Sequence, residues 1–68
     1  MIEWVTVFSS AIRRIGYDSS IKEMYIDFAD SDPYQTYCNV SQDLFYQFVS
    51  ASSVEHFYDH YIKDQYDC

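Results

Sequence analysis

The stretch that decides the fold covers residues 37–66 and reads YCNVSQDLFYQFVSASSVEHFYDHYIKDQY. Its apolar side chains recur every three or four residues, a spacing typical of amphipathic helices. They form two stripes, the first made by Leu44, Phe45, Phe48 and Val49 and the second by Val54, Phe57, Tyr58, Tyr61 and Ile62. Ser41 and Ser53 are placed to cap the N-termini of the two helices. The stretch therefore predicts a helical hairpin whose stripes need a partner surface.

The residues before this hairpin can supply that surface as β-strands. Residues 23–28, EMYIDF, alternate strictly between apolar and other side chains. Successive side chains of a strand point to opposite faces, so this segment should place Met24, Ile26 and Phe28 on one face and Tyr25 and Asp27 on the other.

Other segments have the composition of strands but weaker alternation. Strands are expected over residues 11–17, with a bulge near Gly16, and over residues 34–38. Residues 3–8 suit an extended segment in which Trp4 covers the core. Turns are expected over residues 18–20 and 29–33. The predicted fold class is α+β: a three-stranded antiparallel β-meander packed against a C-terminal helical hairpin, in the order β-β-β-α-α. The 68 residues should form a single domain spanning residues 1–68.

Charge and cysteine content restrict the classes of partner. Eleven Asp and Glu against four Lys and Arg give a net charge of −7 at pH 7, which repels phosphate and anionic membranes and favours a basic partner. The spacing of Cys38 and Cys68 is not that of a disulfide framework, so both are expected to be free thiols in a reducing compartment. Because there is neither a signal-peptide pattern nor an apolar run of about 18 residues, we expect a soluble protein in the cytoplasm without a membrane partner.

Several short motifs occur in an order that resembles the KTSC domain, a module named for its place at the C-terminus of some lysyl-tRNA synthetases and also found alone in small bacterial and phage proteins. The opening run is similar at Ser9, Ser10, Ile12, Gly16, Tyr17 and Asp18, the second strand at Met24, Ile26 and Phe28, the centre at Tyr37 and Val40, and the closing segment at Ala51, Ser53, Phe57, Ile62, Lys63 and Tyr66. The chain departs from the pattern at Gln35, Asn39, Ser41, Glu55 and Asp59. The resemblance implies the fold and a role in RNA binding, and it implies no enzyme activity.

Motifs for catalysis or metal binding are weak in this chain. His56 and His60 stand four residues apart, but a zinc-hydrolase helix would carry Glu directly after the first His, where this chain has Phe57. Cys38, inside an apolar strand, is better suited to a small buried side chain than to a nucleophile. A single glycine cannot form a phosphate-binding loop. We therefore expect no enzyme, no cofactor and no metal.

These observations predict a small acidic module that binds a macromolecule. A protein partner is favoured. In one form of this hypothesis, the carboxylates imitate a phosphate backbone, so that the module inhibits a nucleic-acid-binding protein. RNA binding and self-association into a homo-oligomer are the alternatives. If the sheet face makes the contact, the expected residues are Tyr25, Tyr34 and Tyr37. If the acidic helix face makes it, they are Glu55, Asp59 and Asp64.

Overall fold

Four strands open the chain and pair in sequence order in the computed structural model, which describes residues 1–30, 33–66 and 68. They are β1 (Glu3–Thr6), β2 (Ile12–Asp18), β3 (Glu23–Phe28) and β4 (Gln35–Tyr37), and each pairs antiparallel with the next in the order β1-β2-β3-β4. The sheet is thus a four-stranded meander, and the prediction of three strands was wrong. The segment at residues 3–8, which was not counted among the predicted strands, contains the edge strand β1, because Glu3–Thr6 pairs with Arg14–Tyr17 along its whole length.

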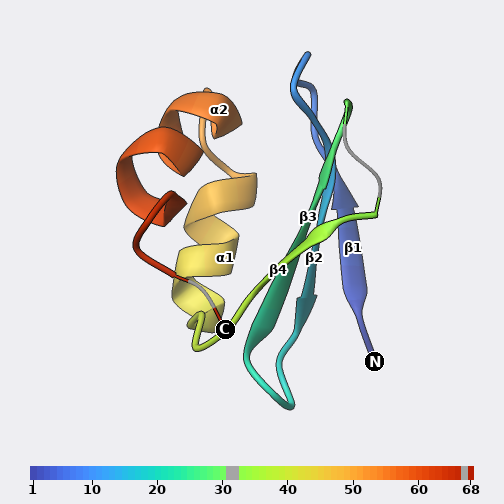
Figure 1. Cartoon of the computed structure of the whole chain (residues 1–68), viewed down its shortest axis with the longest axis vertical. Helices are drawn as coiled ribbons and strands as arrows, with labels where there is room; N and C mark the ends of the chain where they lie inside the picture. Colours follow the sequence, from blue (N-terminus) through green and yellow to red (C-terminus); the bar gives the residue numbers. More distant parts are fainter. Residues whose placement is uncertain (31–32, 67) are drawn as a thin grey trace.

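Two helical segments lie on one side of this sheet, as Figure 1 shows with the sheet seen nearly edge-on. They are α1 (Gln42–Val49) and α2 (Val54–Phe57), and α2 continues directly into the π-helical turn η1 (Tyr58–Ile62). The predicted N-caps are confirmed, since the Ser41 hydroxyl accepts a hydrogen bond from the Leu44 amide and the Ser53 hydroxyl accepts one from the His56 amide. In the part of the chain that is described, no helix has the length and apolar character needed to cross a membrane.

The second helical stripe differs from the prediction at one position. Ile62 and Val54 are buried, whereas Tyr61 is 57% exposed. In the π-turn the Lys63 amide donates to the Tyr58 carbonyl, five residues back, and this wider turn changes which side chains face the sheet. Asp64 follows with a φ of 63°, a left-handed conformation that ends the helix.

The register explains which strand residues face the helices. In β3 the predicted alternation is confirmed: Met24 and Ile26 enter the core, and Tyr25 lies on the other face. The bulge lies between Ile12 and Arg14 rather than near Gly16, so Arg13 is the extra residue. An extra residue interrupts the alternation of side chains between the two faces of the sheet. The side chains of Arg13 and Arg14 therefore both project from the outer face.

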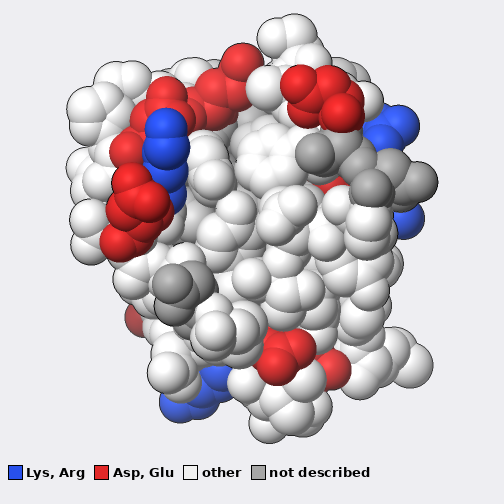
Figure 2. Space-filling model, in the orientation of Figure 1, with Lys and Arg blue, Asp and Glu red and all other residues white. Residues whose placement is uncertain are grey.

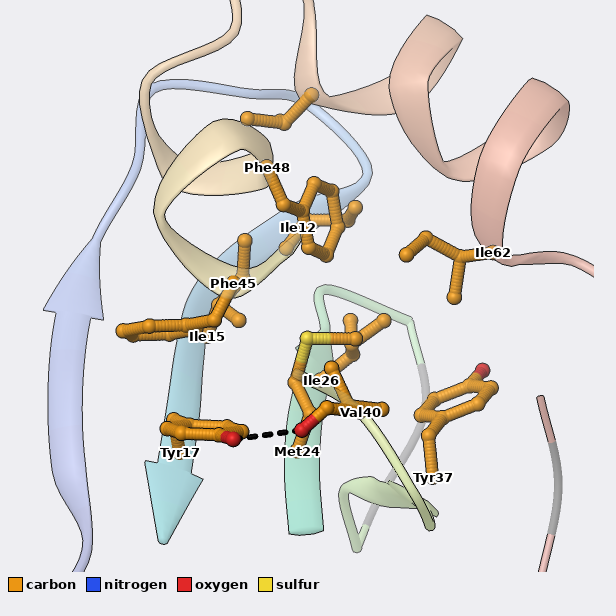
Figure 3. Close-up of a cluster of buried hydrophobic side chains, with 11 residues drawn as sticks. Ile12, Ile15, Tyr17, Met24, Ile26, Tyr37, Val40, Phe45, Phe48 and Ile62 are labelled. Carbon is orange, nitrogen blue, oxygen red and sulfur yellow. Dashed lines mark hydrogen bonds between the residues drawn. The ribbon is translucent and has the colours of Figure 1, made fainter. Parts of the chain in front are cut away.

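The core is a single cluster between the sheet and the helices (Figure 3). Its buried members are Ile12, Ile15, Tyr17, Met24, Ile26, Tyr37, Val40, Phe45, Phe48, Val54 and Ile62. Tyr17 is stacked on Phe45 with ring centroids 4.9 Å apart, and its hydroxyl donates a 2.6 Å hydrogen bond to the Val40 carbonyl. The buried phenol is therefore satisfied at the point where the chain enters α1.

Cys38 and Cys68 are joined by a disulfide, with Cα atoms 5.0 Å apart. The expectation of two free thiols was therefore wrong, because the fold brings together two residues whose spacing in the sequence gave no pairing signal. Disulfides persist mainly in oxidising compartments, so the cytoplasmic location stays a prediction without support from the cysteines. The turn predicted over residues 29–33 includes residues 31 and 32, which lie outside the described residues.

Candidate functional site

The outer face of the sheet carries an aromatic cluster. Trp4 of β1 lies with its ring centroid 5.5 Å from that of Tyr34 and 6.1 Å from that of Tyr25, and the two tyrosine centroids are 5.3 Å apart. Gly16 pairs with Trp4 across β1 and β2, and a Cβ at Gly16 would come within 2.8 Å of the indole ring. The absence of a side chain at Gly16 therefore leaves the space in which the indole lies flat on the sheet. Trp4 belongs to this outer cluster, and the prediction that it covers the core was wrong.

Two arginines border this cluster, and one acidic residue binds both. The Arg14 guanidinium lies 4.2 Å from the centroid of the Trp4 ring, a cation–π contact. Its Nε donates to one carboxylate oxygen of Asp27 at 3.1 Å, and Nη2 of Arg13 donates to the other at 3.2 Å. The single carboxylate of Asp27 therefore offsets half of the positive charge of these two arginines and engages both guanidinium groups within the chain.

The structure brings together two of the three tyrosines predicted as contact residues. Tyr34 is 40% exposed beside the aromatic cluster, whereas Tyr25 is 7% exposed because its neighbours cover it. Tyr37 lies on the opposite, inner face, where its hydroxyl is 3.2 Å from that of Tyr58. Tyr34 is thus the member of this set that offers substantial surface to a partner.

The buried phenols resist ionisation. Burial, together with the hydrogen bond that its hydroxyl donates to Glu23, raises the pKa of Tyr25 to about 12 from its usual value of 10.0. Burial also raises the pKa of Tyr37, with a contribution from the hydrogen bond to Tyr58, and burial alone raises that of Tyr17. In each case the native state favours the neutral phenol.

We expect this preference to limit stability in alkali. A pKa raised on folding stabilises the native state fully below the unfolded value, near pH 10.0, and that contribution is lost as the pH rises towards about 12. Absorbance of tyrosinate followed against pH, alongside far-UV circular dichroism, should show a late group of tyrosines whose ionisation accompanies unfolding. Simultaneous titration of all eight tyrosines near pH 10.0 with an unchanged helical signal would contradict this.

The acidic residues predicted on the helix face occupy α2, η1 and the segment that follows. Glu55, Asp59 and Asp64 are all exposed, and Figure 2 shows acidic side chains gathered over this region at the upper left, with basic atoms among them. His56 and His60 are neighbours on the same helix, with ring centroids 4.1 Å apart. Over residues 1–30, 33–66 and 68, no group of three or more His, Cys, Asp or Glu side chains is arranged to hold a metal ion.

Two hollows are each lined by several residues of the α2 and η1 segments. The larger, of about 480 Å³, lies where α1 gives way to α2 and is lined by Gln47, Ser50, Ala51, Ser52, Ser53, His56, Phe57 and Tyr61. Most of these residues are exposed, so it is a surface depression. The smaller, of about 220 Å³, lies between the sheet and the helical segments and is lined by Ala11, Ile12, Phe28, Glu55, Tyr58 and Asp59. Two of the predicted acidic contact residues thus share one concave site.

Comparison with known proteins assigns the family. The KTSC domain profile matches residues 8–66. The chain belongs to the KTSC domain family. The crystal structure of a KTSC domain protein from Yersinia pestis superimposes with a TM-score of 0.92 at 31% sequence identity, covering 100% of this chain and 94% of the other. No curated protein matches this chain.

The sequence pattern of this KTSC domain did not single out Trp4 and Arg14 as members of the outer surface. A signal was present, because alternation within residues 3–8 places Trp4 opposite Val5 and Val7, which pack on the core. No such signal exists for the pairing of Phe28 with Tyr58, whose rings meet edge to face at 5.4 Å and line the smaller hollow. Those residues are thirty positions apart and come together only through the fold.

Proposed function

We propose that this KTSC domain is a non-enzymatic binding module whose partner is a basic protein. The observation that carries the proposal is the arrangement of charge on the outer sheet face, where Arg13 and Arg14 both donate to Asp27. The other two cations in the sequence are Lys22 and Lys63, and Lys63 directly precedes Asp64. Most of the eleven carboxylates remain to set the sign of the surface potential, which attracts and orients a positively charged partner.

The same arrangement makes RNA the less favoured partner. RNA recognition on a sheet uses exposed aromatic faces for base stacking and free cations for phosphates. Here Tyr25 is covered by its neighbours, and one face of Trp4 is occupied by Arg14. A protein partner with a basic surface, including the basic face of a nucleic-acid-binding protein, needs neither feature from this domain.

Binding to two defined probes tests the proposal. We expect the protein to bind a fluorescent peptide of alternating arginine and glycine, with an affinity that falls when NaCl rises from about 50 to about 150 mM, because exposed charges are screened by salt. A single-stranded RNA of similar length should show no saturable binding under the same conditions. Tight, salt-sensitive RNA binding would overturn the proposal in favour of an RNA-binding module, and failure to bind the basic peptide would also count against it.

A further inference from the structure

The smaller hollow combines apolar walls with an acidic rim. Its lining comes from the start of β2, the end of β3, α2 and η1. Ile12, which is 1% exposed, contributes to the base, and the rings of Phe28 and Tyr58 meet at an interplanar angle of 77°. Both rings line the hollow, and aromatic walls suit an alkyl chain or a flat cation.

Two carboxylates complete this lining. Glu55 and Asp59 are four residues apart and therefore lie on the same side of the helical segment. Both side chains are exposed, and neither makes an ion pair within the part of the chain that is described. Figure 2 shows the acidic band over α2 and η1 bordering uncharged surface between the helical segments and the sheet. Both charges are thus available to a ligand that reaches the apolar walls.

The size of the hollow restricts its occupant. Its volume of about 220 Å³ is below the roughly 300–1,000 Å³ of pockets that hold drug-sized molecules. A single long side chain of a partner protein is a better match. The chemistry of the lining then selects the type of side chain, since it must be apolar along its stem and positively charged at its end.

We propose that this hollow is the anchor site for an arginine side chain of the basic partner, an inference that rests on the proposed function. The aliphatic stem lies against Ile12 and Phe28, the guanidinium plane stacks on the Tyr58 ring, and Glu55 and Asp59 accept its N–H groups. Arginine fits this surface better than lysine because its planar fork can serve two acceptors and stack on an aromatic ring at the same time.

The arginine–glycine peptide and two charge-matched variants test the assignment. Glu55→Gln with Asp59→Asn removes the acidic rim, and Glu3→Gln with Asp43→Asn removes the same charge from exposed positions on other elements. We expect the rim variant to weaken peptide binding at least about tenfold, because it removes two charge-assisted contacts and the loss of one such contact alone costs about a factor of ten. The control variant should weaken it less than about threefold, because its charges act only through screened solvent.

Chemical shifts supply a second measurement that does not depend on substitution. In ¹H–¹⁵N spectra, the peptide should perturb the amides of Ala11, Phe28 and Tyr58 most strongly, and a lysine–glycine peptide should bind more weakly. Equal weakening in both variants, perturbation confined to other elements, or equal affinity for the two peptides would overturn the anchor site while leaving the basic-partner proposal intact. Absence of peptide binding to the unaltered protein would instead contradict the proposed function itself. Dispersed spectra of both variants will show that they remain folded.

Discussion

Replacing Cys68 by serine is expected to lower the free energy of unfolding by about 3–4 kcal/mol. The disulfide to Cys38 closes a loop with a sequence separation of 30 residues, and a cross-link of this length removes much of the conformational freedom of the unfolded chain. The effect should be large relative to the total, because a domain of 68 residues has a small core and modest stability. Urea denaturation followed by circular dichroism measures the loss.

Reductant provides the matched control for this substitution. Unfolding of the unaltered protein in excess dithiothreitol should shift towards the midpoint of Cys68→Ser, and the variant itself should not respond. Cys38 remains in the variant, so its packing on the strand end is retained. A midpoint that is the same with and without reductant in the unaltered protein would show that the bridge makes no contribution in solution.

Replacing Phe45 by alanine is expected to cost about 3–5 kcal/mol of stability. Phe45 is fully buried, and its ring is stacked on Tyr17 at an interplanar angle of 15°. Truncation therefore removes apolar contact and leaves a cavity between α1 and the sheet, beside the hydrogen bond from Tyr17 to the Val40 carbonyl. Thermal and urea denaturation both report the change.

The neighbouring residue on the same helix is a stringent control for Phe45. Tyr46 is 48% exposed, so Tyr46→Ala removes an aromatic ring of similar size with an expected cost below about 1 kcal/mol. A comparable loss at both positions would mean that core packing does not determine the result, because alanine favours the helix at either position. A small loss at Phe45 would contradict the burial of this ring between α1 and β2.

Features that depend on near neighbours in the chain were predicted correctly. The alternation of β3 follows from side chains two residues apart, and each serine cap bonds an amide three residues later. The exposure of Glu55 and Asp59 likewise follows from helical spacing. Local geometry is enough to decide each of these, because the interacting groups are fixed by one segment of regular backbone.

Features that depend on long-range pairing were not predicted. The edge position of β1 requires its register with β2, the disulfide requires the C-terminal segment to reach the end of β4, and the inward direction of Tyr37 depends on its pairing with Met24. Period-two patterns cannot say which face of a three-residue strand is inward. In the candidate site, the acidic residues could be predicted from helical spacing in the sequence. The aromatic walls could not, because they come from β3 and η1, which meet only in the folded chain.

The meander order of the sheet has a consequence for folding kinetics. Every strand pairs with its neighbour in the chain, so each pairing closes a short loop and the entropy lost before contacts form is small. The hairpin of β2 and β3 has the shortest connection, through residues 19–22, and can form first, with the outer strands adding on either side. Such a topology belongs with domains of low contact order, and we expect this one to refold quickly for a protein built on an antiparallel sheet.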